Sequence, residues 1–510
     1  MGHWAVGVAG DAARGTTEEL VFGEAKARWV LAATVLGSGL AFLDATVVNI
    51  ALPAIGGDLD AGVAGLTWTV NGYALTLAAF VLVGGALGDR FGRRRVFLIG
   101  VALFGATSLA CAVATDVGTL VVFRALQGVG AALMTPGALA ILHAAFRAED
   151  RSRAIGAWSG LAGITGAVGP FLGGWLVSIG SWRWIFLINL PVVLVVLAIA
   201  ARHVPESRDA TASGRIDFAG AALAAVGLGS LTYGLSSWPA QGPESVAVRT
   251  GIGLGVIALV GFVAWERTTA RPMLPLSIFS APRFGVTNVV TFLVYAALGG
   301  VFFWLVVSLQ VVADWGPLQA GLSLLPVTLL MLVFSARAGM LGDRLGPRLP
   351  MTVGPLLAAA GVAALSRVGP GASYLPDVVV PVTVLGVGLT LTVTPLTATV
   401  LGAVPESRAG LASGVNNAVA RTGGLLLIAV LPALTGIPEG GFGDASTMEP
   451  AFRAAMLTCA ALLAFGGATS ALLIRPARGV VAGEEPPASC PRYHCDVAGP
   501  PVAASPRSRP

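Results

Sequence analysis

One acidic residue, Asp44, stands inside a long apolar stretch of the sequence. An ionisable group in such a place is costly, so it needs a charged partner or a bound proton. Arg124 stands in a second apolar stretch. If both stretches are helices, Asp44 lies about 13 Å from the helix end near Pro53, and Arg124 lies roughly 9 Å from the end near Gly118. We therefore expect the two side chains to face one cavity at similar depth.

A buried acid beside a buried arginine could carry out proton chemistry. Burial favours the neutral form of Asp44, while a nearby Arg124 favours the charged form, so the opposing effects could poise the carboxyl for proton exchange. Our hypothesis is that protonation of Asp44 alternates with the binding of another molecule. A static structural ion pair is the alternative.

Other polar residues within apolar stretches could line a cavity. Arg421 stands near the middle of such a stretch with no acid close to it in the sequence, which makes it a candidate for a substrate or gating path. Amphipathic aromatic side chains beside polar amides suit mixed ligands, although Trp68 could equally be an interfacial anchor. The remaining candidates for the cavity are Asn49, Asn71, Tyr73, Gln127 and Asn416.

The composition places these residues in a membrane protein. Of the 510 residues, 55% are hydrophobic and 11% are charged, whereas ordinary globular domains carry about 25% charged residues. The mean hydropathy is +0.82. The net charge is +5, and Lys26 is the single lysine. The arginines fall in short clusters between apolar runs, so we expect no nucleic-acid partner.

A bilayer core of about 30 Å needs roughly 20 apolar residues per helix. The sequence predicts fourteen transmembrane helices in an all-α polytopic protein. They lie at 29–51, 66–88, 96–115, 118–142, 155–179, 184–201, 217–237, 250–266, 284–309, 317–336, 350–366, 376–401, 410–434 and 454–474.

Arginine in the short loops fixes the expected orientation, because Arg and Lys are enriched on the cytoplasmic side. With both termini inside, the outer loops receive only Arg183, Arg249, Arg367 and Arg453. The inner loops receive the clusters around residues 90–95, 147–153, 202–215, 267–283 and 337–348, together with Arg408. A missed span would have broken this alternation.

An internal repeat organises the fourteen helices. The loop Gly85-Ala-Leu-Gly-Asp89-Arg90-Phe-Gly92-Arg93 returns as Gly339-Met-Leu-Gly-Asp343-Arg344-Leu-Gly346-Pro347, so Asp343 follows Asp89 at an offset of 254 residues. Such repeats are typical of secondary transporters, in which two bundles rock against each other around a substrate site. A duplicated scaffold without a transport role is the alternative. We predict a cytoplasmic lead (1–28), a six-helix bundle (29–203), an inserted two-helix hairpin with linkers (204–283), a second six-helix bundle (284–474) and a disordered cytoplasmic tail (475–510).

Two glycine-rich segments have a physical reading of their own. In the first inner loop, Asp89 can pair with cytoplasmic arginines or with a helix N-terminus, which would make a latch; alternatively, the arginines only set the topology. In the fifth span, glycines recur every three or four residues and form a smooth face for tight helix packing. Pro170 interrupts the backbone hydrogen bonds there. The residues of this segment are Gly166, Gly169, Pro170, Gly173 and Gly174.

The loop GALGDRFGRRR resembles the signature of the major facilitator superfamily, and further pieces resemble its fourteen-span drug:proton antiporter family. These pieces run from Leu43–Pro53 through Arg124–Gly130, Gly169–Gly174 and Trp182–Pro191 to Gly410–Asn417. The resemblance implies a major facilitator fold of 6+2+6 helices. It also implies a conformational gate at Gly85, Asp89, Arg90, Gly92, Arg93, Asp343 and Arg344, and an antiport role for the fifth span, although ordinary packing explains that span equally well.

The resemblance further implies proton-driven export of amphipathic drugs, dyes, antiseptics or secondary metabolites across a bacterial plasma membrane. We expect no cofactor beyond the proton gradient and no nucleotide, because Lys26 does not stand in a P-loop pattern. Cys490, His494 and Cys495 match a metal site only loosely, so we expect no metal.

Two other functions compete with export. The first is uptake or facilitated diffusion of a nutrient on the same fold. The second is a membrane enzyme or sensor, but the sequence holds neither H-E-x-x-H nor G-x-S-x-G, and no loop is long enough for a sensor domain. We expect no enzymatic activity. Helices ten and thirteen carry no acid, which predicts poor transport of divalent cations.

Overall fold

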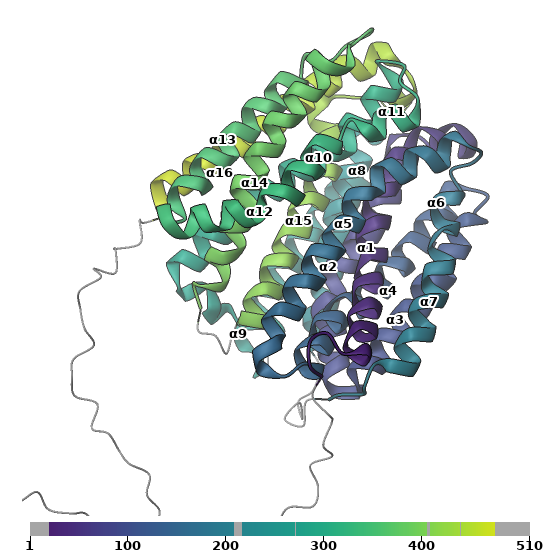
Figure 1. Cartoon of the computed structure of the whole chain (residues 1–510). Coiled ribbons are helices and arrows are strands. Elements are labelled where there is room, and N and C mark those ends of the chain that lie inside the picture. The colour runs from purple at the N-terminus through teal and green to yellow at the C-terminus, as the bar shows by residue number, and fades with distance from the viewer. Residues whose placement is uncertain (1–19, 209–216, 271, 405–408, 439, 475–510) are drawn as a thin grey trace, which may run out of the picture. The chain divides into compact units, whose positions relative to one another are not determined.

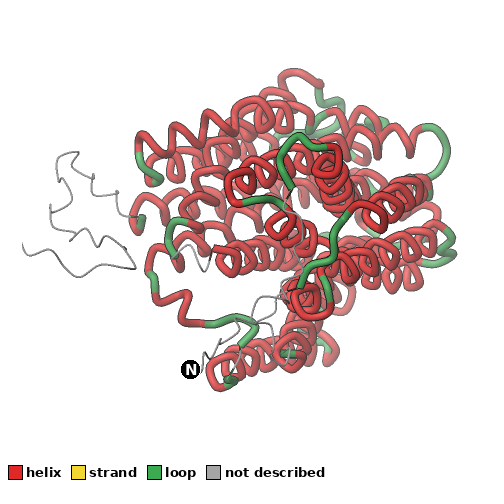
Figure 2. Tube along the Cα trace, turned by 60° about the horizontal axis from the view of Figure 1, so that its bottom comes forward, coloured by secondary structure: helices red, strands yellow, loops and turns green. Residues whose placement is uncertain are grey.

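The computed structural model describes residues 20–208, 217–270, 272–404, 409–438 and 440–474, and within these ranges the regular structure is helical (Figures 1 and 2). The only strand-like contact in them is an isolated bridge between Leu20 and Phe146. The α-helices are α1 Ala25–Leu59, α2 Val63–Phe91, α3 Arg93–Ala112, α4 Val117–Ala145, α5 Ala148–Ser178, α6 Trp184–Leu187, α7 Asn189–His203, α8 Phe218–Gln241, α9 Val246–Thr268, α10 Pro282–Val311, α11 Pro317–Leu322, α12 Leu325–Leu345, α13 Arg348–Leu365, α14 Val380–Leu401, α15 Ala409–Thr435 and α16 Ala445–Leu473.

The expected membrane spans are present as long apolar helices. Thirteen helices of the described ranges are long and apolar enough to cross a bilayer, and each coincides with one predicted span. The sixth span is broken into α6 and α7, and the tenth into α11 and α12. The remaining span, 155–179, falls on α5, a helix of 31 residues in which only Val168–Ser178 registers as an apolar segment among the described residues.

Helix contacts concentrate within two sets of helices. In the first set, α1 packs on α4, α5 and α7, while α4 packs on α2 and α3. In the second set, α10 packs on α15 and α16, and α13 packs on α14 and α16. Helices α8 and α9 form an antiparallel pair, in which α8 also contacts α2 and α15. The exact division into bundles and hairpin stays a prediction.

The internal repeat has a counterpart in the backbone. Gly92 separates α2 from α3 with a φ of +114°, and Gly346 separates α12 from α13 with a φ of +75°. These two glycines are 254 residues apart, the offset of the repeated loop. A positive φ is accessible to glycine without steric cost, so each copy of the loop needs this residue at the helix junction.

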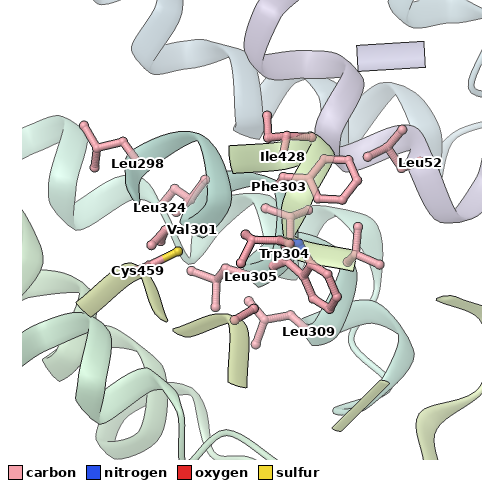
Figure 3. Packing of buried hydrophobic residues seen from close by; sticks show 14 of the residues in the cluster. Leu52, Leu298, Val301, Phe303, Trp304, Leu305, Leu309, Leu324, Ile428 and Cys459 are labelled. Atoms are coloured by element: carbon pink, nitrogen blue, oxygen red, sulfur yellow. The ribbon is translucent and has the colours of Figure 1, made fainter. Parts of the chain in front are cut away.

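A large apolar core joins helices of both sets. Figure 3 shows Trp304 and its α10 neighbours Phe303 and Leu305, with Leu52 of α1 and Cys459 of α16 around them. Trp304, Phe303 and Leu52 are fully buried. Burial of side chains of this size stabilises a fold by about 1.5–3 kcal/mol each in water; within lipid, close packing contributes more than water exclusion does.

The described start of the chain differs from the prediction. The first helix begins at Ala25, so the last residues of the predicted lead 1–28 already belong to it. Before the helix, the Phe22 N–H donates to Asp150 at 3.0 Å, and this bond together with Arg147 holds the pKa of Asp150 below its ordinary value.

The tail 475–510, including the Cys490, His494 and Cys495 cluster, lies outside the described residues.

The contact between α2 and α4 makes a testable prediction. A Cβ on Gly84 would fall on the carbonyl oxygen of Ala132, a backbone atom that cannot move aside. We expect Gly84→Ala to lower the free energy of unfolding by about 1–3 kcal/mol through overpacking. The measurement is the thermal unfolding midpoint of the purified protein in detergent.

The neighbouring Gly85 provides the matched control. A Cβ there would lie 3.6 Å from the Cβ of Pro136, an ordinary contact. Gly85→Ala should therefore melt at or slightly above the wild-type temperature, because alanine is better than glycine inside a helix. Equal midpoints for the two variants would show that α2 and α4 do not approach as closely as the structure has them.

Candidate functional site

Asp44 of α1 and Arg124 of α4 form a buried ion pair. The Nη1 of Arg124 donates to the Oδ2 of Asp44 at 2.5 Å. The side chain of Asp44 is fully buried, and that of Arg124 is 1% exposed. The predicted pairing of these two residues at one depth therefore holds in the structure. Whether the pair moves a proton is a separate question.

Three further side chains complete the polar network around the carboxylate. Gln127, one turn after Arg124, donates to the Oδ1 of Asp44 at 3.0 Å and accepts from Arg124 at 2.6 Å. Asn189 of α7 donates to the same Oδ1 at 3.4 Å. Ser108 of α3 accepts from both Gln127 and Asn189, at 2.7 and 3.1 Å. Four helices thus converge on one carboxylate.

Arg124 is held on its other sides by α2 and an aromatic pair. Its Nε donates to the carbonyl of Thr69 at 3.1 Å. Its guanidinium lies 4.5 Å from the ring centroid of Tyr73 and 5.7 Å from that of Phe186. The Tyr73 hydroxyl donates to the carbonyl of Ala41 in α1 at 3.2 Å. The cation is therefore fixed by hydrogen bonds and by aromatic faces, which attract a desolvated cation.

This arrangement gives Asp44 two chemical states. As a carboxylate it balances Arg124 and accepts from three side chains. Protonation would remove the countercharge of Arg124 at a buried position, where a lone charge is expensive. A change of protonation at this single oxygen pair would therefore reorder contacts that span α1, α3, α4 and α7.

The glycine face of α5 covers α1 beside Asp44. A Cβ on Gly169 would strike Thr46 of α1, and one on Gly173 would strike Val47. On another side, Gly174 lies against Pro317 of α11, and the carbonyl of Pro170 lies against Gly321. The predicted packing role of this face is thus present. The surroundings of Gly166 lie outside the described residues, and the antiport role stays a prediction.

The predicted gating loop forms a compact charged turn between α2 and α3. Asp89 accepts from Arg93 at 2.9 and 2.8 Å, and Arg93 also reaches the carbonyl of Ala140 in α4 at 3.4 Å. Arg90 lies over the ring of Phe91. In the second copy, Arg344 is exposed in the last turn of α12, and the side chain of Asp343 lies outside the described residues. The gating role itself stays a prediction.

Sequence reasoning missed a second acid at the loop between α2 and α3. The Oε1 of Glu206, just beyond α7, accepts from the backbone N–H of Arg94 at 3.1 Å in the first turn of α3. Its other oxygen lies 3.8 Å from both Arg94 and Arg95. The carboxylate lies 2.7 Å from the position of a Cβ on Gly92, so the glycine makes room for it. Glu206 therefore caps α3, where a negative charge is favourable.

Besides Tyr73, three of the predicted cavity residues lie on α1 and α2. The buried amide of Asn71 has no hydrogen-bond partner on either atom, and the Oδ1 of Asn49 has none. Trp68 is half-buried on α2. A buried polar atom without a partner costs about 1–3 kcal/mol, so Asn49 and Asn71 are available to a ligand or to water.

The remaining two cavity residues lie on α15. Asn416 accepts from Thr291 of α10 at 2.7 Å and is thereby occupied within its own helix set. Arg421 donates to Asn417 at 3.1 Å and acts electrostatically on Tyr73 and Tyr295. No ion pair joins Arg421 to an acid of the described chain. No cluster of three metal-binding side chains was found in the same ranges.

The buried pair predicts a strong coupling of two substitutions. Asp44→Leu or Arg124→Met alone strands a buried charge and should cost about 3–5 kcal/mol of unfolding free energy. The double variant removes both charges and should be more stable than either single variant. Thermal unfolding of the four proteins in detergent measures the coupling.

An exposed pair in the same set of helices serves as the control. Asp58 and Arg183 form an ion pair with side chains 47% and 34% exposed, and exposed pairs contribute little. Asp58→Asn should leave the melting temperature nearly unchanged. If the Asp44 and Arg124 substitutions proved simply additive, the two charges would not depend on each other.

Comparison with known proteins agrees with the observed fold. The model of the Major Facilitator Superfamily matches residues 34–428. The Tetracenomycin C resistance and export protein of Streptomyces glaucescens is 36% identical over 409 residues, 79% of this chain and 75% of that protein. The Puromycin resistance protein pur8 of Streptomyces alboniger is 34% identical over 429 residues, 83% of this chain and 85% of that protein.

A solved structure shares the fold at low sequence identity. It is a bacterial homolog of the human lysosomal transporter Spinster in an inward-facing, unoccupied conformation, with a TM-score of 0.65 and 17% identity over 88% of this chain and 97% of that one. Family model, relatives and fold agree, and the chain belongs to the major facilitator superfamily of membrane transporters.

Proposed function

We propose that this protein is a proton-coupled antiporter that exports amphipathic drugs or secondary metabolites by alternating access. The family makes it a transporter, and the names of relatives specify resistance and export, as in the Multidrug resistance protein Stp of Mycobacterium tuberculosis, 36% identical over 402 residues. We accordingly place the protein in a bacterial plasma membrane, with both termini in the cytoplasm, as part of the same proposal.

The observation that carries the coupling is the Asp44 network. A single buried carboxylate accepts from Arg124, Gln127 and Asn189. A proton arriving from the acidic side of the membrane would weaken the bond to Arg124. The released guanidinium and amides are then free to rearrange, and this change biases the equilibrium between the two access states.

The contacts between the two helix sets support rocking. Near the end predicted to be extracellular, α5 packs on α11 through Gly174 and Gly321, and Gln310 of α10 donates to the carbonyl of Ile50 in α1 at 3.0 Å. The apolar core shared by Leu52 of α1 and Trp304 of α10 lies near the same end. In alternating access the two sets would separate at these contacts when this end opens.

The substrate would bind beside the carboxylate, between the sets. Tyr73 lies beside the carboxylate network, because its ring packs on the Arg124 guanidinium at 4.5 Å and its hydroxyl donates to the carbonyl of Ala41 in α1. The unpartnered amides of Asn49 and Asn71 supply hydrogen bonds. An amphipathic molecule can use the aromatic face for its apolar part and the amides for its polar part.

The proton-coupling proposal predicts that Asp44→Asn abolishes uncoupler-sensitive efflux. Asparagine fits the same space but cannot exchange a proton, so transport should fall to the passive leak. The measurement is uptake of a fluorescent drug into everted vesicles with an acidic lumen, because export appears as uptake in this orientation; it is normalised to the amount of folded protein in the membrane.

Asp58→Asn, on the same helix, is the control and should transport like wild type, because Asp58 is an exposed residue paired with Arg183. Proton-driven efflux that survives Asp44→Asn would sink the coupling proposal. A loss of drug uptake into the vesicles in both variants would instead point to impaired folding, which the protein amount reveals.

The charge of the site predicts weak transport of dications. Among the described residues, α12 carries Arg337 and Asp343, while α15 carries Arg421 and no acid, so the second helix set offers no carboxylate at mid-membrane depth to balance a second positive charge. A dicationic antiseptic should be exported more slowly than a monocationic dye of similar size. The ratio should approach one in Arg421→Gln, and equal rates in wild type would refute the prediction.

A further inference from the structure

Two carboxylates face each other at one end of the α8–α9 pair. Asp217 precedes the first residue of α8, and Glu266 lies in the last turn of α9 with a side chain 3% exposed. The Oδ2 of Asp217 and the Oε1 of Glu266 each lie 2.7 Å from the position that a Cβ would take on Gly220. Gly220 therefore leaves room for the two oxygens to meet.

Neither of these two oxygens has a hydrogen-bond partner. The other oxygen of each group is already engaged: the Oδ1 of Asp217 accepts from Gly220 N at 2.8 Å and from Trp265 Nε1 at 2.9 Å, and the Oε2 of Glu266 accepts from Leu274 N at 2.9 Å. The backbone and Trp265 thus hold both carboxyls in place and leave one bare oxygen on each.

No positive charge balances the pair in the described chain. Arg267 follows Glu266 but its side chain is exposed, and none of the ion pairs found includes either acid. The charged residues on the helices packed against α8 are Arg249 and Arg267 on α9, Asp89 and Arg90 on α2, and Arg421 on α15. Because Glu266 is buried and Asp217 is partly buried, two negative charges side by side here would repel.

We propose that Asp217 and Glu266 bind one proton between them at neutral pH and so fasten this end of the α8–α9 pair. The proton forms a hydrogen bond from one carboxyl to the other carboxylate, which satisfies both bare oxygens. This is a proton site separate from Asp44. It belongs to the helix pair for which the repeat leaves no counterpart.

A proton suits the site better than a metal ion. Calcium and magnesium require six or more oxygen ligands, whereas two oxygens are free here and the other two accept N–H bonds. No third acid, histidine or cysteine joins them in the described chain. A carboxyl–carboxylate bond needs only the two oxygens that the structure presents.

The proton site has a mechanical consequence. Helix α8 contacts both α2 and α15, which belong to different helix sets, so the packing of α8 is felt by both. Loss of the proton would place two negative charges side by side and push the ends of α8 and α9 apart. The packing of α8 against α2 and α15 would then depend on the pH on the side of the membrane where Asp217 and Glu266 lie.

Infrared spectroscopy of the purified full-length protein tests the proposal. The wild type should show a protonated-carboxyl C=O band at pH 7 that is lost in Glu266→Gln and in Asp217→Asn. Both variants suit the site, because glutamine can donate to Asp217 and asparagine also caps helices. Glu244→Gln, an exposed acid between the same two helices, should keep the band.

Thermal unfolding against pH provides a second readout. Near neutral pH the folded protein would hold one proton more than the unfolded chain, so wild-type stability should fall as the pH rises. Glu266→Gln should lack this part of the slope. A wild-type spectrum without the band, a band insensitive to both substitutions, or an unchanged slope in Glu266→Gln would each overturn the proposal.

Discussion

A charge inside a bilayer must be balanced where it stands, and the ion pair of Asp44 and Arg124 is the constraint around which the first helix set is built. The carboxylate accepts from three side chains on α4 and α7, and Ser108 of α3 accepts from two of them, so these helices must meet at one depth. The glycine face of α5 then allows that helix to close over α1 beside the pair. The α1–α5 contact, the buried ion pair and the proposed proton site thus all lie around Asp44.

The sequence was sufficient to predict this pair, because depth in a membrane helix follows from residue counting. Asp44 and Arg124 could be matched without knowing which way either side chain points. Ser108 and Asn189 could not be found in this way, since neutral polar residues are common in membrane helices and their convergence depends on helix rotation. Asn189 stood in a segment noted for its motif, but Ser108 had no comparable signal.

Local backbone geometry was the less predictable part of the fold. The breaks between α6 and α7 and between α11 and α12 leave the hydropathy unchanged. A count of apolar residues therefore does not detect them. Glu206 follows the sixth span in a linker, and its contact with the turn at Gly92 joins segments more than a hundred residues apart. Asn416 was predicted to line a cavity, and in the structure its side chain accepts a hydrogen bond from Thr291 at the contact between α15 and α10. Each case depends on tertiary contacts rather than on composition.

The position of α8 between α2 and α15 has a kinetic meaning. When two bodies rock, a helix attached to both must slide along at least one of them, so part of the motion becomes shear between packed surfaces rather than a pure hinge. Even an added Cβ on Gly229 of α8 would lie 3.4 Å from a methyl carbon of Leu75 in α2, so this glycine leaves the contact smooth. The α8–α9 pair would then slow the conformational change during turnover. The extent of slowing would depend on how α8 packs against its neighbours and against lipid.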